Sequence, residues 1–241
     1  MPSFKEQAIV LRSRPFGEAD KTVTLFSRDR GKFTGLAKGA RRIKSKFGAR
    51  LEPFTYADFF LAHGRNLNVI SQIETIKLFT SLRQGDKLNA AIYLIRLVDL
   101  FTERGQHNQE LFDLLLNGLN LLERSIEPST VVAVFNVLLA SIEGLTPRLA
   151  ECAVCGAAPG QDEGKLKINF GAGGVVCNKC ASGNDISLSS KVAEFVKKIY
   201  TVDLTRLKKI EVDKKLAAEI NRFFAQYLAY QIGQEPLYYE E

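Results

Sequence analysis

The sequence lacks the short motifs that mark most nucleotide-binding and hydrolytic enzymes. It has no G-x-x-x-x-G-K-[ST] phosphate loop, no H-E-x-x-H zinc motif and no G-x-S-x-G nucleophile motif. Its two histidines, His63 and His107, stand alone, and its acidic residues are scattered without a metal-binding pattern. The glycine-rich stretch GAGG at 171–174 lies between two cysteine pairs, so it does not indicate a dinucleotide-binding loop. We therefore expect a protein that is not an enzyme.

Long hydrophobic runs are also missing. No window approaches the roughly 18 consecutive apolar residues that a membrane-spanning helix needs. The opening MPSFKEQAIVLRS has neither the apolar core nor the small-residue cleavage site of a signal peptide. We expect a cytoplasmic protein with no membrane partner, and the 46% apolar and 25% charged residues fit an ordinary globular chain.

Positive charge is concentrated in the first third of the chain. Residues 1–80 carry 15 Lys and Arg against 7 Asp and Glu, whereas residues 81–241 carry 18 against 20. Such asymmetry indicates a polyanionic partner for the N-terminal part, although surplus basic charge also occurs for solubility alone.

The first 80 residues read as short strands separated by turn residues. Segments rich in β-branched and aromatic residues, several alternating with period two, lie at 8–13, 22–27, 32–38, 54–62 and 66–74. Closing five short strands into a barrel removes exposed edges. We predict a five-stranded OB-fold barrel over residues 1–80, with a small SH3-like barrel as the alternative.

From residue 81 the hydrophobic period becomes helical. Helices are predicted within 86–105, 108–124, 127–144, 189–200 and 213–233, with Gly105 ending the first and Asp213 and Gly233 bounding the last. The third is apolar on most sides and should be central to a bundle. The predicted class is therefore α+β and multidomain, with a helical domain at 81–241 that contains an inserted module at 145–188.

All four cysteines lie in this inserted module. Cys152-x-x-Cys155 and Cys177-x-x-Cys180 let two tight turns present four thiolates to one ion. Four sulfur ligands leave no open position, so we expect one structural Zn²⁺ in a zinc ribbon-like module. The alternatives are disulfides, which are unusual in a chain without an export signal, and a redox-active pair, which does not explain two pairs.

The densest positive charge lies at 38–51, KGARRIKSKFGARL. No acidic residue occurs between Asp29 and Glu52, so these cations cannot all be paired locally. Clustered cations gain most from phosphates, where binding releases condensed counterions. We predict a nucleic-acid-binding segment with neighbouring arginines, formed by Lys38, Arg41, Arg42, Lys44, Lys46, Arg50, Arg12 and Arg14. Arg28 and Arg30 would extend it, and stacking on bases is open to Phe16, Phe33, Phe47 and Tyr56, most of which we expect in the core.

Together these parts resemble the RecO family of bacterial recombination mediators over nearly the whole chain. The resemblance is carried by Lys38-Gly39-Ala40-Arg41-Arg42, Lys44-Ser45, Pro53-Phe54, CAVCG…GGVVCNKC and the C-terminal YQIGQEPL, where Gln231 replaces the histidine of many relatives. It implies a non-enzymatic protein that binds single- and double-stranded DNA and anneals complementary strands without ATP. It also implies action with RecR in loading RecA, contact with the acidic C-terminal tail of single-stranded DNA-binding protein (SSB), and association with the nucleoid. An RNA-binding or ribosome-associated zinc-ribbon protein and an unrecognised nucleic-acid enzyme remain the alternatives.

Overall fold

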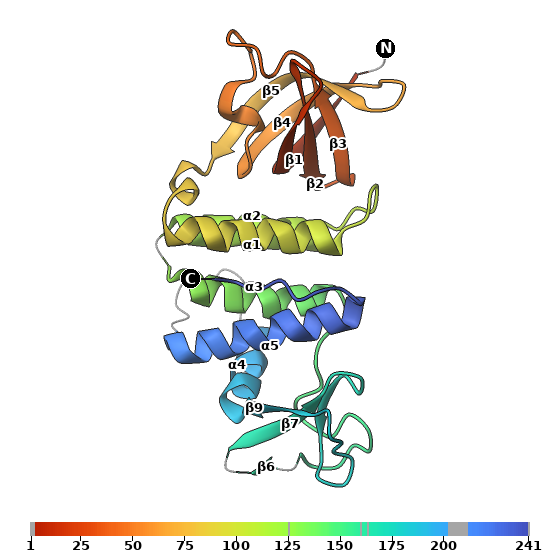
Figure 1. Cartoon of the computed structure of the whole chain (residues 1–241), viewed down its shortest axis with the longest axis vertical. Helices are drawn as coiled ribbons and strands as arrows, with labels where there is room; N and C mark the ends of the chain where they lie inside the picture. Colours follow the sequence, from red (N-terminus) through yellow and green to blue (C-terminus); the bar gives the residue numbers. More distant parts are fainter. Residues whose placement is uncertain (1–2, 125, 160, 163, 202–211, 241) are drawn as a thin grey trace. The chain divides into compact units, whose positions relative to one another are not determined.

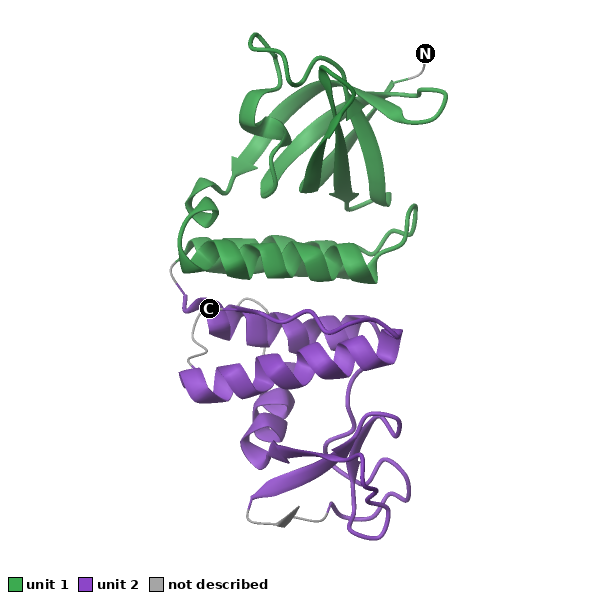
Figure 2. Cartoon of the chain, in the orientation of Figure 1, with its two compact units in different colours: residues 1–125 green, residues 126–241 purple. Residues whose placement is uncertain are grey.

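The structure is a computed structural model that describes residues 3–124, 126–159, 161–162, 164–201 and 212–240. The chain forms two compact units, residues 1–125 and 126–241 (Figure 2). Among the described residues, the first unit contains a β-barrel followed by two α-helices, and the second contains three α-helices and a small sheet (Figure 1).

The barrel is closed by five strands in the order β1-β2-β3-β5-β4. Only β3 and β5 pair in parallel, and the other neighbours are antiparallel. The strands are β1 Ser3–Phe16, β2 Asp20–Ser27, β3 Gly31–Ala37, β4 Thr55–Ala62 and β5 Asn68–Leu78. Along β4, buried residues alternate with half-buried ones, so every second side chain enters the barrel core. The predicted α+β class with an OB-type barrel is confirmed.

Two antiparallel helices, α1 Asp86–Phe101 and α2 Gln109–Glu123, follow the barrel within the first unit. A short 3-10 helix, η2 Thr80–Arg83, leads into them. The α2 ring of Phe112 lies 5.9 Å from the Phe26 ring, and Lys77 forms a 2.6 Å ion pair with Glu123. The Asn108 side chain caps α2 by accepting a 2.9 Å hydrogen bond from the Leu111 amide. The helices thus cover one end of the barrel.

Helix α1 ends earlier than the sequence predicts. Gly105 was the expected stop, but the helix ends at Phe101, with Thr102 in an extended conformation. The following residues pair with the barrel instead, because the Gly105 amide donates a 3.0 Å hydrogen bond to the Lys32 carbonyl. Residues 102–105, which the hydrophobic period assigned to the helix, therefore follow an extended path on which Gly105 hydrogen-bonds to β3.

The second unit is built on α3 Pro128–Ile142, α4 Ser190–Thr201 and α5 Lys214–Ile232. Helix α3 is buried on most of its sides, as its composition predicts, and it packs against α4 and α5. At the start of α5 the Asp213 side chain accepts from the Lys215 and Leu216 amides. Gly233 ends it in a left-handed conformation, with φ of 63°. Both predicted ends of this helix are confirmed.

The cysteine-bearing module contains a small sheet built around β7. Strand β7 pairs antiparallel with β6, β8 and β9. Their bounds are β6 Gln161–Asp162, β7 Lys165–Asn169, β8 Gly174–Val176 and β9 Ile186–Ser189. Strand β9 runs directly into α4, so the module is tied at its end to the helices of the second unit.

The division of the chain into a barrel domain and a helical domain at residue 80 stays a prediction. The last barrel strand ends at Leu78, four residues beyond the predicted 66–74, and α1 and α2 group with the barrel in the first compact unit. The helices of the predicted 81–241 domain are thus shared between the two units.

Candidate nucleic-acid interface and metal centre

The basic segment is a turn-rich connection between β3 and β4 that is anchored in the barrel core. Its backbone turns through hydrogen bonds from Arg42 to Gly39 and from Ser45 to Arg42, before the short 3-10 helix η1 Gly48–Leu51. Phe47 and Leu51 are almost fully buried and belong to the core cluster of the barrel. Two apolar side chains therefore hold the segment from within while the residues between β3 and Phe47 remain at the surface.

The same segment is fastened to the turn between β1 and β2. The Gly39 amide donates a 2.7 Å hydrogen bond to the Asp20 carboxylate, and the Arg41 amide donates at 2.9 Å to the carbonyl of Ala19. The Arg41 guanidinium also donates to the Gly17 carbonyl at 2.9 Å. These contacts place the basic segment at the end of the barrel opposite α1 and α2 (Figure 1).

The cations of this segment are not neutralised by carboxylates. Lys46 donates to the Ser71 carbonyl at 2.6 Å, and Arg50 donates to the carbonyls of Phe47 and Ile73 at 3.0 and 3.1 Å. The first acidic residue after the segment, Glu52, pairs with Lys21 at 2.7 Å. Within the residues that the structure describes, none of the six cations forms an ion pair; five are exposed and Arg50 is half-buried. Their positive charge is available to a ligand.

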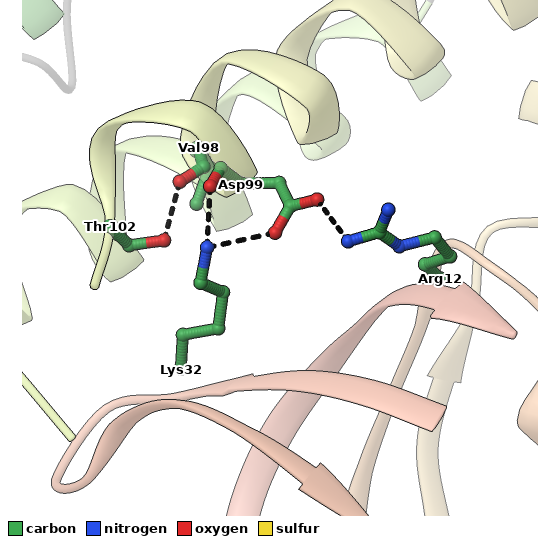
Figure 3. A network of polar contacts seen from close by, with 5 residues as sticks. All are labelled: Arg12, Lys32, Val98, Asp99 and Thr102. Carbon is green, nitrogen blue, oxygen red and sulfur yellow. Dashed lines mark hydrogen bonds and ion pairs between the residues drawn. The ribbon is translucent and has the colours of Figure 1, made fainter. Parts of the chain in front are cut away.

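Arg12 differs from this set because it faces α1. Its guanidinium forms a 2.6 Å ion pair with Asp99, which also pairs with Lys32 at 2.9 Å (Figure 3). The carbonyl of Asp99 accepts a further hydrogen bond from Lys32, and the Thr102 hydroxyl donates to the Val98 carbonyl at 2.6 Å. One carboxylate thus binds two cations of the barrel, and the assignment of Arg12 to nucleic acid stays a prediction with a competing partner.

The other arginines considered from the sequence divide in the same way. Arg28 forms an ion pair with Asp113 of α2, which raises the pKa of the guanidinium through a hydrogen bond and charge attraction. Arg30 pairs with the buried carboxylate of Glu6. Arg14 is exposed near the end of β1, and it has no ion pair among the described residues. Arg12 and Arg28 are therefore paired with carboxylates of α1 and α2, whereas Arg14 and the six cations of the basic segment have no ion pair among the described residues.

Of the four candidate stacking aromatics, only Phe16 is exposed, with 51% of its surface accessible. Phe47 is buried, Phe33 packs partly against the barrel core, and Tyr56 is half-buried and donates to Gln7. Ile43, which was not predicted from the sequence as a candidate contact for nucleic acid, is fully exposed between Arg42 and Lys44. The feature of the sequence that could have identified this residue is a large apolar side chain inside a run of cations.

The second candidate site is the cluster of Cys152, Cys155, Cys177 and Cys180. Their sulfur atoms all lie within 4.8 Å of one another, and those of Cys155 and Cys177 are 3.7 Å apart. Tetrahedral coordination with metal–sulfur bonds of about 2.3 Å requires sulfur atoms roughly 3.8 Å apart. The four residues therefore fit the binding of one metal ion.

Backbone amides make this cluster receptive to negative charge. A hydrogen bond from the Cys177 amide, with a second from the Cys155 amide, lowers the pKa of Cys152 to about 6. The amide of Cys180 likewise lowers the pKa of Cys177. By contrast, hydrogen bonds with the Cys155 and Cys177 thiols raise the pKa of Cys180 to about 12. A bound cation would favour the ionised form of every thiol in the cluster.

Comparison with known proteins identifies the family of the chain. Residues 1–79 match the family model described as Recombination protein O N terminal, and residues 82–238 match Recombination protein O C terminal. The chain belongs to the RecO family. DNA repair protein RecO of Alkaliphilus metalliredigens is 34% identical over 228 residues, covering 93% of this chain and 92% of that protein. The protein of the same name from Desulforamulus reducens is 34% identical over 240 residues, covering 98% and 92%.

Membership of the RecO family connects this barrel with DNA repair by recombination. A third relative named DNA repair protein RecO, from Desulfitobacterium hafniense, is 35% identical over 241 residues, covering 94% of this chain and 85% of the relative. In the described part of this RecO-family chain, no helix is both long and apolar enough to cross a membrane.

Proposed function

We propose that this chain is a recombination mediator without catalytic activity, which binds single- and double-stranded DNA and anneals complementary strands without ATP. The observation that carries the proposal is the surface formed by Lys38, Arg41, Arg42, Lys44, Lys46 and Arg50, whose charges have no carboxylate partner among the described residues. Arg14 extends this surface. Cations of this kind neutralise the phosphates of two strands, lower their mutual repulsion and allow the bases to pair.

The partners follow from the family rather than from any contact in the chain. We infer that the protein acts with RecR to load RecA, and that it binds the acidic C-terminal tail of SSB so that coated strands are substrates. This activity would lie in the cytoplasm at the nucleoid, where bacterial DNA is found. The family membership and its named relatives in DNA repair support these assignments.

We infer further that the four cysteines hold one structural Zn²⁺. Zinc binds four thiolates in a tetrahedron, and the ion has no redox chemistry of its own. The cluster has four sulfur ligands and leaves no position for water, so the ion would stabilise the fold of the module and not supply a reaction. The strands of the module bury Leu166, Ile168, Val175 and Val176, and the ion would add to the stability of this small core.

The test is strand annealing with complementary oligonucleotides, one coated with SSB, in the absence of ATP. We expect the protein to accelerate annealing, and the double variant Arg41→Glu/Arg42→Glu to lose most of that acceleration. A matched control is Lys191→Glu/Lys197→Glu, which changes net charge equally at two exposed lysines of α4. Cleavage of the DNA with magnesium, or binding of RNA in preference to DNA, would contradict the proposal.

A further inference from the structure

Two large apolar side chains are exposed at the positively charged end of the barrel, opposite α1 and α2. Phe16 ends β1 with 51% of its surface accessible, and Ile43 lies fully exposed in the basic segment. The barrel core holds most of the other large apolar residues of this region, Val10, Leu25, Phe59 and Leu61 among them. In the part of the chain that the structure describes, no ring contact or cation–π contact involves Phe16.

The two side chains belong to segments that are held together by hydrogen bonds to backbone carbonyls. Phe16 directly precedes Gly17, whose carbonyl accepts from the Arg41 guanidinium at 2.9 Å, and Ile43 follows Arg41 by two residues. The Arg41 amide also binds the carbonyl of Ala19 at 2.9 Å, in the same turn between β1 and β2. The exposed pair is therefore carried on two connections that hold each other in place.

Cations surround this pair in the sequence. Arg14 lies two residues before Phe16, while Arg42 and Lys44 flank Ile43, and all three are exposed. Two acids lie in the adjoining turn: Asp20 accepts a hydrogen bond from the Gly39 amide, and Glu18 is exposed. The excess of positive charge around the apolar pair favours a polyanionic partner.

A single-stranded nucleic acid offers the complementary chemistry. Its phosphates match the cations, and its unpaired bases present apolar faces that a duplex keeps stacked inside. We propose that Phe16 stacks on an unpaired base and that Ile43 packs against a neighbouring base, while Arg14, Arg42 and Lys44 hold the phosphates. The inference rests on the proposed function and refines it: this end of the barrel distinguishes single strands from duplex through its apolar pair, whereas the cations bind both.

The experiment compares a thymine 20-mer, an abasic 20-mer with the same backbone and a 20-base-pair duplex. Aromatic stacking on bases predicts that the wild-type protein binds the thymine strand at least about tenfold more tightly than the abasic strand. The variant Phe16→Ala/Ile43→Ser should lose this preference while its affinity for the abasic strand and the duplex changes less than about twofold. A matched control is Ile76→Ser, which removes another exposed apolar side chain from β5 and should retain the preference.

The outcomes separate this inference from the proposed function. Equal wild-type affinity for thymine and abasic strands overturns the inference, while a loss of binding in Arg41→Glu/Arg42→Glu still supports the proposed function. A Phe16→Ala/Ile43→Ser variant that weakens duplex binding as much as thymine binding also overturns it, since the pair would then act as a wedge in duplex DNA. Absence of binding to all three nucleic acids overturns both.

Discussion

A Cβ atom placed on Gly31 would lie 1.9 Å from the carbonyl oxygen of Gln106. Gly31 begins β3, and Gln106 lies in the connection between α1 and α2, so the barrel and its two helices meet here backbone to backbone. Gly31 also has a φ of 64°, a left-handed conformation that residues with a Cβ adopt only at a cost. Both observations identify a position where only glycine fits.

Gly31→Ala is therefore expected to lower the free energy of unfolding of the first unit by about 2 kcal/mol or more, since backbone strain and the close approach both contribute. Urea denaturation followed by circular dichroism measures this loss. Gly105→Ala is the matched control because Gly105 also has a positive φ, but an added Cβ would meet nothing within 4 Å. Equal losses in the two variants would show that the approach to Gln106 is not the cause.

Arg12 and Arg14 are expected to respond oppositely to truncation. Arg12→Ala removes one of the two cations bound by Asp99, so the free energy of unfolding should fall by about 1 kcal/mol while DNA affinity changes little. Arg14→Ala should leave stability unchanged and reduce the salt slope of DNA binding by about one unit. The measurements are urea denaturation and DNA affinity at several salt concentrations. A large loss of DNA affinity in Arg12→Ala would instead support the sequence-based prediction that Arg12 contacts nucleic acid.

Reversing charge at Arg41 and Arg42 should weaken DNA binding irrespective of base sequence. Each arginine that contacts a phosphate releases condensed counterions, so the double variant should flatten the dependence of log affinity on log salt by roughly two units. Fluorescence anisotropy with labelled oligonucleotides between low and moderate salt measures both quantities. Lys191→Glu/Lys197→Glu controls for net charge, and an unchanged slope in the Arg41/Arg42 variant would place the interface elsewhere.

The metal centre predicts one Zn²⁺ per chain by elemental analysis. Cys155→Ser should release it and increase hydrogen exchange in residues 145–188 while the barrel remains protected, because a structural zinc contributes directly to the folding of its module. Val154→Ser is the control, since Val154 is an exposed neighbour in the same turn that offers no ligand. Wild-type protein without zinc, or unchanged exchange in Cys155→Ser, would contradict a structural role.

Local patterns in the sequence predicted the elements and the metal cluster well. Strand periodicity, the Asn and Asp helix caps and the two Cys-x-x-Cys pairs are all determined by neighbours within a few residues, which explains why α2, α5 and the sulfur cluster lie where expected. The Cys-x-x-Cys spacing also allows both thiolates of a pair to bind the same metal ion.

The features that could not be predicted from the sequence depend on contacts between residues far apart in the chain. The partner of Arg12 is Asp99, 87 residues away, and no local pattern connects them. The same holds for the backbone β-bridge between Arg104 and Lys32, which lies just beyond the early end of α1. Among the aromatics, composition does not tell that Phe47 turns inward and Phe16 outward, because that choice depends on which side of the closed barrel each residue reaches.

The burial of Phe47 and Leu51 has a consequence for anyone who alters this protein. The connection that carries the free cations also supplies two side chains to the barrel interior, so shortening it or exchanging it for a neutral linker would leave a hole where the sheet closes. Loss of DNA handling after such a deletion would then report a damaged scaffold. A role for the charges can be deduced from substitutions of the cations that leave Phe47 and Leu51 in place.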